Sequence, residues 1–311
     1  MANGKAGIVF FGTSGICIPF LESLRSVFDI RLIITQPDGY GGRKKKLIEP
    51  AVKKYAVGNK IRFVQPDKLN RDIASIISDT DPLISVVISY GKFIPGKVFR
   101  VPEFNTVNVH FSLLPELRGA APYQRAVEKG METTGISIFE IGKEMDAGDI
   151  WSSKEFRILP EDTSESLSQR MGVEGAEFLT ETIQKIISGK IKKEPQDHSM
   201  ATYAKAVSKN EGKINWEESS AEIFNKYRAF FPWPGISFFS GEKKITIKKM
   251  KLSIDRKNAP PGTVLSVTKE SLKVSCGNNS AIEILSILPQ GKKEMTPYIY
   301  SLGNSIVGKL S

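Results

Sequence analysis

The sequence predicts an α/β fold built on a parallel sheet, followed by a small antiparallel β-barrel. Up to about residue 190, short apolar runs alternate with longer amphipathic ones, as strands and their covering helices do. Beyond residue 203, short alternating segments follow one another instead. A chain of 311 residues also exceeds the usual size of one domain. We therefore predict domains at 1–189 and 203–311, joined by a linker at 190–202.

The elements of the first domain are short apolar runs bounded by turn residues, with amphipathic stretches between them. Strands are expected at 7–11, 30–35, 61–64, 83–89, 106–110, 135–141 and 150–156. Helices are expected at 18–27, 68–78, 122–129 and 163–188. The last of these follows Asp162, has an acidic first turn that suits the positive end of a helix, and ends at Gly189.

The segment 190–202 is polar and charged, contains Pro195 and lacks an apolar period, which favours a linker. His198, one of two histidines in the chain, is expected to be a solvated linker residue. In the second domain we expect a short helix near 221–229 and strands at 243–252, 262–268, 271–276 and 281–287.

Aromatic residues lie between the prolines of the segment AFFPWPG. We expect them to pack the short helix against the barrel, because aromatic side chains dominate buried contacts; the alternative is that they are exposed and stack on bases. They are Phe230, Phe231 and Trp233.

The composition, 40% hydrophobic and 25% charged, is that of a globular protein. The apolar stretch near the N-terminus is too short for a signal sequence or a membrane span. Cys17 and Cys276 are too few for a disulfide framework or a zinc site, which favours a reducing compartment. We expect a cytoplasmic protein with no membrane partner.

The net charge of +10 is unevenly distributed. Residues 203–311 carry 17 Lys and Arg against nine Asp and Glu, whereas residues 1–202 carry 27 against 25. A basic second domain indicates a polyanionic partner such as a nucleic acid, although a merely solvated surface has the same composition.

Asn108 and His110 stand two residues apart at the carboxyl end of an expected strand, so their side chains share a face. Open α/β sheets bind ligands at this edge. An amide donor beside an imidazole can stabilise negative charge that develops on a carbonyl oxygen. This pair therefore predicts an acyl-type transfer.

A carboxylate is needed to orient the histidine and favour its charged form. The segment GKEMDAGDI offers Asp146 and Asp149, either of which could instead be a turn former. Ser112 lies outside a G-x-S-x-G elbow, so direct transfer to an external amine is simpler than a covalent intermediate. The two histidines are too far apart in the sequence to favour a catalytic metal.

The turn after the first strand contains Gly12 and Gly15 but lacks the third glycine of a dinucleotide fingerprint, so a Rossmann NAD site is disfavoured.

A second glycine-bearing loop, QPDGYGGRKKKL, places Arg43, Lys44, Lys45 and Lys46 together. The loop is either a solvated surface loop or a contact for phosphates.

The chain resembles the methionyl-tRNA formyltransferase family most clearly in NVHFSLLPELRGAAPYQRA. Further segments resemble the family in the same order: TQPDGYGGRKKKL, VVISYGKFIP, MDAGDI, TYAKAVSKNEGKINW, AFFPWPG and APPGTVL. The core NxHxSLLP is shared by other formyl-folate enzymes, but RGAAP favours the tRNA enzyme over glycinamide ribonucleotide transformylase. The resemblance runs over nearly the full length.

This resemblance implies that a formyl group passes from 10-formyltetrahydrofolate to the amino group of methionine on initiator tRNA, leaving tetrahydrofolate. It implies a Rossmann-like formyltransferase domain at 1–189 and an OB-like, tRNA-binding barrel at 203–311. We expect a monomer that uses no metal.

By the same resemblance, Asn108, His110 and Asp146 fall on the catalytic asparagine, histidine and aspartate. The folate-contacting segment corresponds to Ser112, Leu113, Leu114 and Pro115. Arg43 aligns with a key arginine of the loop that meets the tRNA acceptor end, and the following lysines, Lys44, Lys45 and Lys46, are assigned to tRNA with it.

The sequence departs from the family at two positions. Gly39 stands where relatives often carry a basic residue, and Phe111 where a small residue is common. Phe111 either shapes the folate pocket or packs on the sheet. Three other functions remain open: formyl transfer to a sugar-nucleotide amine, hydrolysis of 10-formyltetrahydrofolate, and RNA binding with a relic active site.

Overall fold

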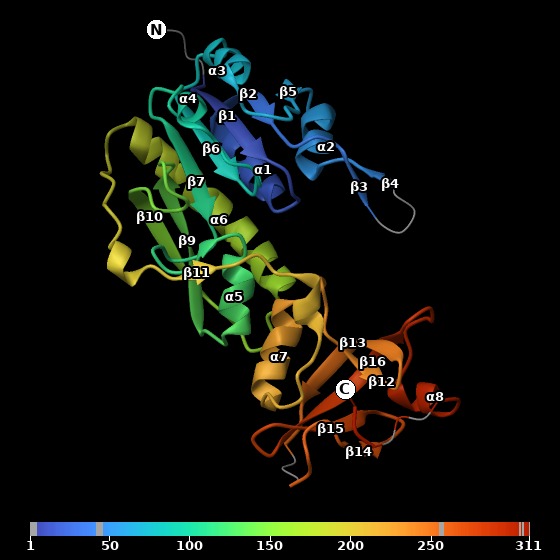
Figure 1. Ribbon diagram of the computed structural model, residues 1–311. Coiled ribbons are helices and arrows are strands. Elements are labelled where there is room, and N and C mark those ends of the chain that lie inside the picture. The colour runs from blue at the N-terminus through green and yellow to red at the C-terminus, as the bar shows by residue number, and fades with distance from the viewer. Residues whose placement is uncertain (1–4, 42–45, 255–257, 305, 307, 311) are drawn as a thin grey trace. The chain divides into compact units, whose positions relative to one another are not determined.

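The computed structural model describes residues 5–41, 46–254, 258–304, 306 and 308–310. The chain forms two compact units, shown in Figure 1. The first unit draws on Met1–Pro122, Thr133–Arg157 and Ser168–Ala204. The second draws on Tyr123–Glu132, Ile158–Leu167 and Lys205–Ser311.

The first unit is built on a seven-stranded sheet of order β10-β9-β7-β6-β1-β2-β5. The strands β1, β2, β5, β6 and β7 run parallel, as expected for a Rossmann-like sheet. The strand bounds are β1 Gly7–Gly12, β2 Asp29–Ile34, β5 Phe63–Val64, β6 Ile84–Ile88, β7 Thr106–His110, β9 Thr133–Glu140 and β10 Ile150–Arg157.

Two strands at one edge, β9 and β10, run antiparallel to their neighbours. Only residues 141–149 connect them, and a parallel crossover needs a dozen residues or more. A short connection therefore makes β10 return antiparallel beside β9, and this connection brings Asp146 next to His110 at the carboxyl end of β7.

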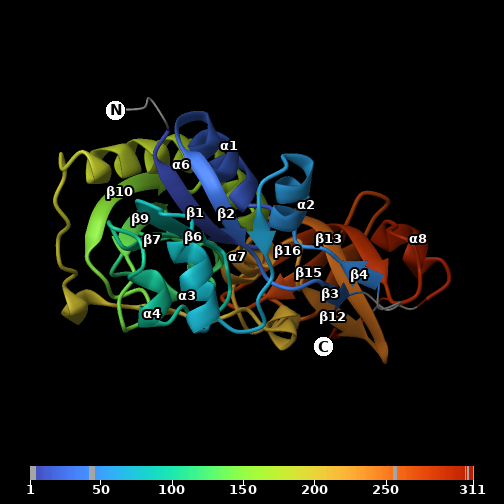
Figure 2. The ribbon, with the colours of Figure 1, turned by 90° about the horizontal axis from the view of Figure 1, so that it is seen from above.

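Helices cover both faces of this sheet (Figure 2). On one face lie α1 (Cys17–Val27) and α6 (Ser164–Ile187), and on the other lie α3 (Arg71–Ser78) and α4 (Gly96–Phe99). The helices expected at 18–27, 68–78 and 163–188 are therefore confirmed, whereas the one expected at 122–129 falls mostly in the second unit. Neither α4 nor α2 (Ala51–Gly58) was expected. α4 has only four residues, and α2 has no side-chain cap at its N-terminus, unlike the equally short α3, which Asn70 caps.

The core between the sheet and α3 is apolar and closely packed. Val9, Phe11 and Ile77 lie in it, and the rings of Phe11 and Tyr90 meet edge to face with centroids 5.5 Å apart. Truncating such a buried phenylalanine to alanine typically costs about 3–5 kcal/mol. The sheet is therefore a rigid base for residues at its ends.

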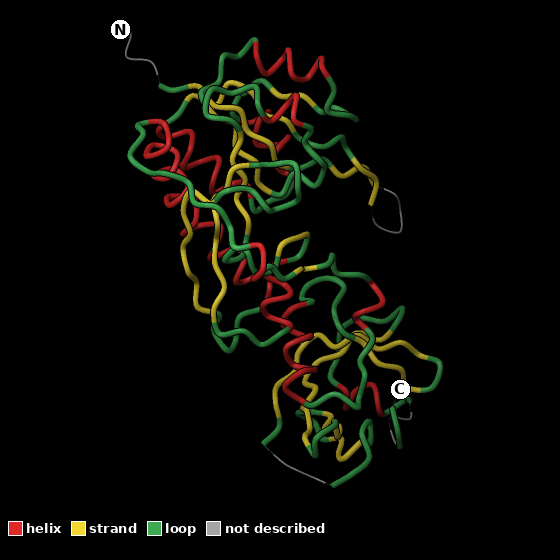
Figure 3. Tube along the Cα trace, turned by 60° about the vertical axis from the view of Figure 1, so that its left-hand side comes forward, coloured by secondary structure: helices red, strands yellow, loops and turns green. Residues whose placement is uncertain are grey.

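A hairpin of β3 (Gly39–Gly41) and β4 (Lys46–Ile48) extends from this unit beside α2 (Figures 1 and 3). Lys53 of α2 pairs with Asp38 before the hairpin and with Glu49 after it, at 2.5 and 2.8 Å. One lysine thus ties both ends of the hairpin to the unit.

Residues 190–204 belong to the first unit rather than standing apart from it. Gln196 is buried, Glu194 exchanges backbone hydrogen bonds with Ile150, and β11 (Tyr203–Ala204) pairs in parallel with β8 (Arg118–Gly119). His198 is exposed, as expected. The functional division at residues 189 and 202 stays a prediction.

The second unit contains a five-stranded antiparallel sheet of order β12-β13-β16-β15-β14 (strands are yellow in Figure 3). Because β12 and β14 are its edges, the sheet is a half-barrel rather than a closed barrel. Its strands are β12 Ser237–Ser240, β13 Lys243–Leu252, β14 Val264–Val267, β15 Leu272–Cys276 and β16 Ser280–Pro289. Its helices are α5 Pro122–Glu128, α7 Ser220–Ala229 and α8 Pro297–Ser301.

The strand β13 shows the alternation that predicted it. Ile245 and Ile247 are buried, while Lys244 and Lys248 lie on the other face.

The expectation for AFFPWPG was wrong in part: Phe230 is fully buried, but Trp233 is 61% exposed. Phe230 directly follows α7, whereas Trp233 lies in the surface turn beyond it.

Across the described residues, no helix is long and apolar enough to span a membrane.

Candidate active site

The carboxyl end of β7 places Asn108 and His110 on one face of the sheet, as their spacing predicted. His110 is 5% exposed and Asn108 is half-buried. From β1 the chain adds β2 and β5 on one side, and then β6 and β7 on the other side of β1. The strand order therefore switches between β1 and β6, and β7 lies next to β6. Ligands bind near such a switch point in open α/β sheets.

The imidazole of His110 is fixed through its Nε2 atom, which lies 2.9 Å from the carbonyl oxygen of Leu117. A carbonyl can only accept a hydrogen bond, so Nε2 carries the proton. Its Nδ1 atom faces Asp146, with 3.7 Å between Nδ1 and the carboxylate Oδ2. The ring of Phe139 meets the imidazole edge to face, at 6.4 Å between centroids.

Burial lowers the pKa of His110, because the charged imidazolium loses its hydration. The Asp146 charge and the hydrogen bond to Leu117 raise this pKa, and the Arg118 charge lowers it, but burial is the largest cause. The imidazole is therefore neutral at pH 7. With the proton on Nε2, the lone pair is on Nδ1 and available as a base.

Asp146, and not Asp149, is the carboxylate beside His110. The backbone N–H of Gly119 donates to Asp146 Oδ2 at 2.8 Å, whereas Asp149 pairs with Lys193 at 3.5 Å. Asp146 has a φ of 53°, in the left-handed region that Asp tolerates better than most residues. The alternative left open by the sequence is thereby resolved geometrically.

A glycine allows the Asp146 loop to approach the sheet. A Cβ atom on Gly148 would lie 1.8 Å from the carbonyl oxygen of Glu140, so no other residue fits there. The loop is thus held against the end of β9 (Thr133–Glu140) with Asp146 toward β7.

The side chain of Asn108 has unused donors. Among the residues that the structure describes, none forms a hydrogen bond with its amide. A half-buried amide without a protein partner, on the same strand face as His110, can donate to the oxygen of a bound acyl group.

The segment predicted to contact folate forms the turn after β7. The hydroxyl of Ser112 is buried and donates to the carbonyl oxygen of Glu116 at 2.6 Å, so it is engaged within the turn. Leu114 is buried, and its N–H donates to Ser137 Oγ at 2.9 Å. Leu113 and Pro115 are half-buried, and the folate role of all four residues stays a prediction.

Phe111 is 7% exposed, and its ring meets Phe20 of α1 edge to face at 6.2 Å. Phe111 therefore packs between the sheet and α1, and a part in the folate pocket stays a prediction.

The cationic loop is only partly described. Arg43, Lys44 and Lys45 lie outside the described residues, and Lys46, at the start of β4, is exposed. Their assignment to tRNA stays a prediction.

Several residues that build the site carried no signal in the sequence. The Leu117 carbonyl and the Gly119 N–H act through the backbone, so their side chains do not indicate these contacts. Gln196, within the predicted linker, donates to the carbonyl oxygens of Asp146 and Gly148. No local pattern marks a polar residue that becomes buried through such distant contacts.

No metal centre is formed by the described side chains, since they contain no group of three or more His, Cys, Asp or Glu suited to hold one.

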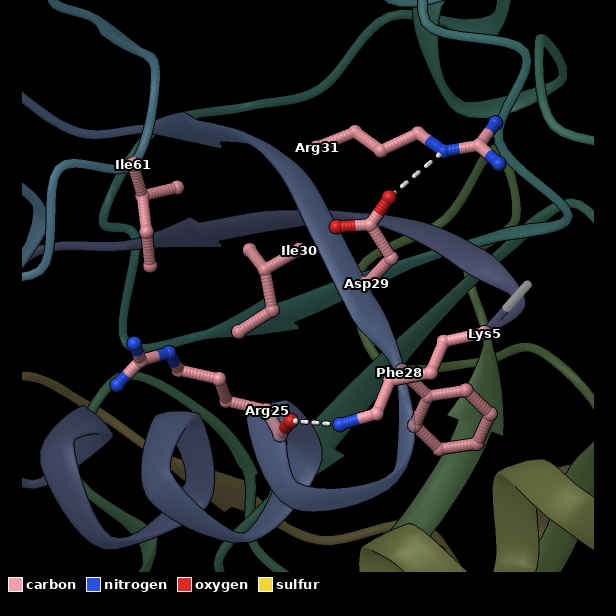
Figure 4. A pocket seen from close by; sticks show the side chains of 7 residues that line it. All are labelled: Lys5, Arg25, Phe28, Asp29, Ile30, Arg31 and Ile61. Carbon is pink, nitrogen blue, oxygen red and sulfur yellow. Dashed lines mark hydrogen bonds and ion pairs between the residues drawn. The ribbon is translucent and has the colours of Figure 1, made fainter.

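A hollow of about 500 Å³, lined by Lys5, Arg25 and Arg31 among others, lies at the amino end of β2 (Figure 4). Because β2 and β7 run parallel, the amino end of β2 and the carboxyl end of β7 lie at opposite ends of the strands, so this hollow is far from His110. Lys5 already donates to the Arg25 and Ser26 carbonyls there.

Two family models match the chain. One, described as formyl transferase, matches residues 8–183, and the other, described as formyl transferase C-terminal domain, matches residues 206–304.

Relatives named methionyl-tRNA formyltransferase match nearly the whole chain. The protein of Sulfurihydrogenibium sp. is 39% identical over 92% of this chain and 93% of its own length. That of Thermodesulfovibrio yellowstonii is 37% identical over 97% of both chains. That of Staphylococcus epidermidis is 34% identical over 97% of this chain and 98% of its own.

Solved structures of low identity share the fold. The sugar 3N-formyltransferase WlaRD, solved with dTDP and 5-N-formyl-THF, is 19% identical with a TM-score of 0.68, covering 94% of this chain and 100% of its own. An N-formyltransferase from Helicobacter canadensis is 20% identical with a TM-score of 0.67, covering 91% and 99%. HypX from Aquifex aeolicus with tetrahydrofolic acid is 17% identical with a TM-score of 0.62, covering 97% of this chain and 47% of its own.

Proposed function

The chain belongs to the methionyl-tRNA formyltransferase family, and we propose that Asn108, His110 and Asp146 carry out that family's reaction in it. The enzyme transfers a formyl group from 10-formyltetrahydrofolate to the α-amino group of methionine on initiator tRNA. The observation that carries the residue assignment is the convergence of a fixed imidazole, a carboxylate 3.7 Å from its free nitrogen, and an unpartnered amide.

The reaction begins with attack of the methionine amine on the formyl carbon. An α-amino group titrates near pH 8, so a useful fraction is neutral at pH 7 without strong activation. Asn108 donates to the formyl oxygen as negative charge develops on it. Holding both reactants at one strand end supplies much of the remaining rate enhancement.

The hydrogen bonds of His110 define its part in the reaction. Its Nε2–H is donated to Leu117, so the amine proton goes to Nδ1. The imidazolium so formed faces the Asp146 carboxylate, which stabilises its charge. Only then does Nδ1–H become available as a second donor to the oxyanion or as an acid for the leaving nitrogen.

Folate binding is proposed for the turn after β7. Leu113, Leu114 and Pro115 follow His110 directly, and an apolar wall beside convergent polar groups is the usual form of such a site. We assign the Ser112 hydroxyl to holding this turn, because it is engaged with Glu116.

We propose that tRNA binds through the hairpin loop with Arg43, Lys44, Lys45 and Lys46, and through the basic residues 203–311. The supporting observations are the exposed Lys46, the concentration of lysines in the second half and the exposed Trp233. Phosphates supply most of the affinity for such a surface, and exposed aromatics can stack on bases.

The acceptor experiment tests this function. The wild-type protein is incubated with 10-formyltetrahydrofolate and, in separate reactions, with Met-tRNA, a sugar-nucleotide amine or water alone. Formyl-methionyl-tRNA as the dominant product supports the proposal. Dominant transfer to the sugar amine or to water would instead identify a sugar formyltransferase or a hydrolase, and tRNA binding without product a relic site.

We further propose that the protein acts as a monomer in the cytoplasm, where charged tRNA and folate are found. Its described cysteines, Cys17 and Cys276, are buried and unpaired, which fits a reducing compartment. Light scattering at micromolar concentration should give the mass of one chain, 34.4 kDa. A stable dimer mass would contradict the monomer.

A further inference from the structure

Arg118 is a buried cation next to the site. It is 5% exposed and stands between Leu117 and Gly119, whose backbones contact His110 and Asp146. Its guanidinium donates to the side-chain oxygen of Gln196 from Nε at 3.2 Å and from Nη2 at 2.6 Å. Nη2 also lies 3.0 Å from His198 Nδ1.

The partners of this cation are neutral. Within the part of the chain that the structure describes, no carboxylate forms an ion pair with Arg118. An arginine cannot lose its proton, so the charge stays, and burying it without a counter-charge is costly. We therefore expect the Arg118 charge to act on the groups next to it in the site.

Gln196 connects Arg118 to the catalytic loop. While its oxygen accepts from Arg118, its Nε2 donates to the carbonyl oxygens of Asp146 at 2.9 Å and of Gly148 at 2.7 Å. Every hydrogen-bonding direction of this buried amide is thereby used. The Gln196 amide therefore holds the backbone of Asp146, which faces His110. It also holds the backbone of Gly148, which lets the loop approach β9.

We propose that Arg118 and Gln196 are positioning residues that hold the Asp146 loop against His110, and that the uncompensated Arg118 charge acts on the imidazole in addition to burial. The inference rests on the proposed function of the site. It explains why a polar residue of the segment 190–202 is buried within the first unit.

The electrostatics agree with the geometry. The charged groups that act on His110 are Asp146, which favours its protonation, and Arg118, which opposes it. Beyond Arg118 stands His198, which accepts from the guanidinium and so is unprotonated at Nδ1. The other neighbours of the imidazole, the Leu117 carbonyl and the Phe139 ring, carry no charge.

Gln196→Ala tests the positioning. A displacement of about 1 Å at a catalytic group can cost ~10²-fold in rate, so kcat should fall by roughly 10- to 100-fold. KM for Met-tRNA and for the folate should change little. Ser199→Ala is the matched control: Ser199 lies in the same segment, is exposed and bonds only Asp197, so its kcat should match the wild type.

Arg118→Met and Arg118→Lys separate charge from geometry, through NMR titration of the histidine rings. The chain has only two histidines, so His110 is readily assigned. Met removes the charge and should raise the pKa of His110. Lys keeps the charge without the planar fork, so it should keep the pKa low while kcat stays reduced.

Each variant must be shown to be folded, by thermal unfolding and by binding of the folate 5-N-formyl-THF. If Gln196→Ala does not fold, Gln196→Glu replaces it, since it keeps the acceptor for Arg118 but sets an oxygen against the Asp146 and Gly148 carbonyls. A folded Gln196 variant with wild-type kcat, or an unchanged His110 titration in Arg118→Met, would overturn the inference. If the wild type does not formylate Met-tRNA, the proposed function fails first, and the titration still tests the electrostatic part.

Discussion

The Nε2 atom of His110 donates a hydrogen bond to the carbonyl oxygen of Leu117, at 2.9 Å. This single contact fixes the imidazole tautomer and leaves the lone pair on Nδ1, the nitrogen that faces Asp146. The chemistry of the site follows from it, because the neutral ring can accept a proton only at Nδ1.

The pH dependence of the reaction should therefore have two components. Below about pH 8 the methionine amine becomes protonated, so log kcat/KM should fall with a slope of one. Burial holds the pKa of His110 below its usual 6.5, so the slope should steepen toward two only below pH 6.5. Initial rates with Met-tRNA between pH 5 and 9 measure this, and steepening above pH 6.5 would contradict it.

The same lowered pKa predicts how stability depends on pH. The unfolded chain binds a proton at His110 near pH 6.5, whereas the folded chain binds it only at lower pH. Stability is thus fully present above pH 6.5 and is lost as pH falls below it. Urea unfolding of the wild type and of His110→Gln should show the variant losing less stability between pH 7 and pH 5. Equal losses in both proteins would refute the assignment.

Asn108→Ala should abolish most activity without weakening the fold. Removing one oxyanion donor typically costs ~10²–10³-fold in kcat. The side chain forms no hydrogen bond with the described residues, so the melting temperature should hardly change. Asn108→Asp keeps the shape but loses the amide donor, and should be equally impaired. Turnover above a tenth of wild type in either variant would remove Asn108 from the mechanism.

Gly119→Ala should damage both stability and catalysis. Gly119 has a φ of 120°, and a Cβ there would lie 2.7 Å from the Ala204 carbonyl oxygen, while its N–H anchors Asp146. Backbone strain of this kind costs on the order of 1–3 kcal/mol, so calorimetry should show a melting temperature several degrees lower. Gly58→Ala is the control, since a Cβ there meets no atom within 4 Å. A Gly119→Ala protein as stable and active as this control would contradict the account.

Lys46→Ala should weaken tRNA binding in a salt-dependent manner. If Lys46 contacts a phosphate, its loss should reduce the slope of log K against log salt by about one. Lys190, an exposed lysine outside the hairpin, serves as the control. Filter binding of Met-tRNA at several salt concentrations gives both slopes. An unchanged slope for Lys46→Ala would exclude it from the contact.

The fold was predictable where local pattern decides structure. β7 and β13 have the bounds that apolar alternation predicted, and Asn108 and His110 of β7 share a face for the same reason. The antiparallel direction of β9 beside β7 was not foreseen from the sequence pattern, and that of β10 follows from the short connection 141–149. α2 was missed because no side chain caps its N-terminus, whereas the equally short α3 follows the capping residue Asn70.

The site was predictable only in its side chains. Asn108 and His110 follow from strand spacing, but the choice between Asp146 and Asp149 needed the contact with Gly119. Gln196 lies 50 residues beyond Asp146 in the chain, and its burial follows from tertiary contacts. Trp233 shows the converse, because an aromatic residue beside prolines suggested burial and is exposed.

The most direct test of the role proposed for His110 is single-turnover formylation of Met-tRNA by excess enzyme with saturating 10-formyltetrahydrofolate. This format isolates chemistry from product release. The wild type should form formyl-methionyl-tRNA rapidly, and His110→Ala should do so at least ~10²-fold more slowly while binding both substrates normally. Equal rates in the two proteins, or formate release without formyl-methionyl-tRNA, would contradict the account.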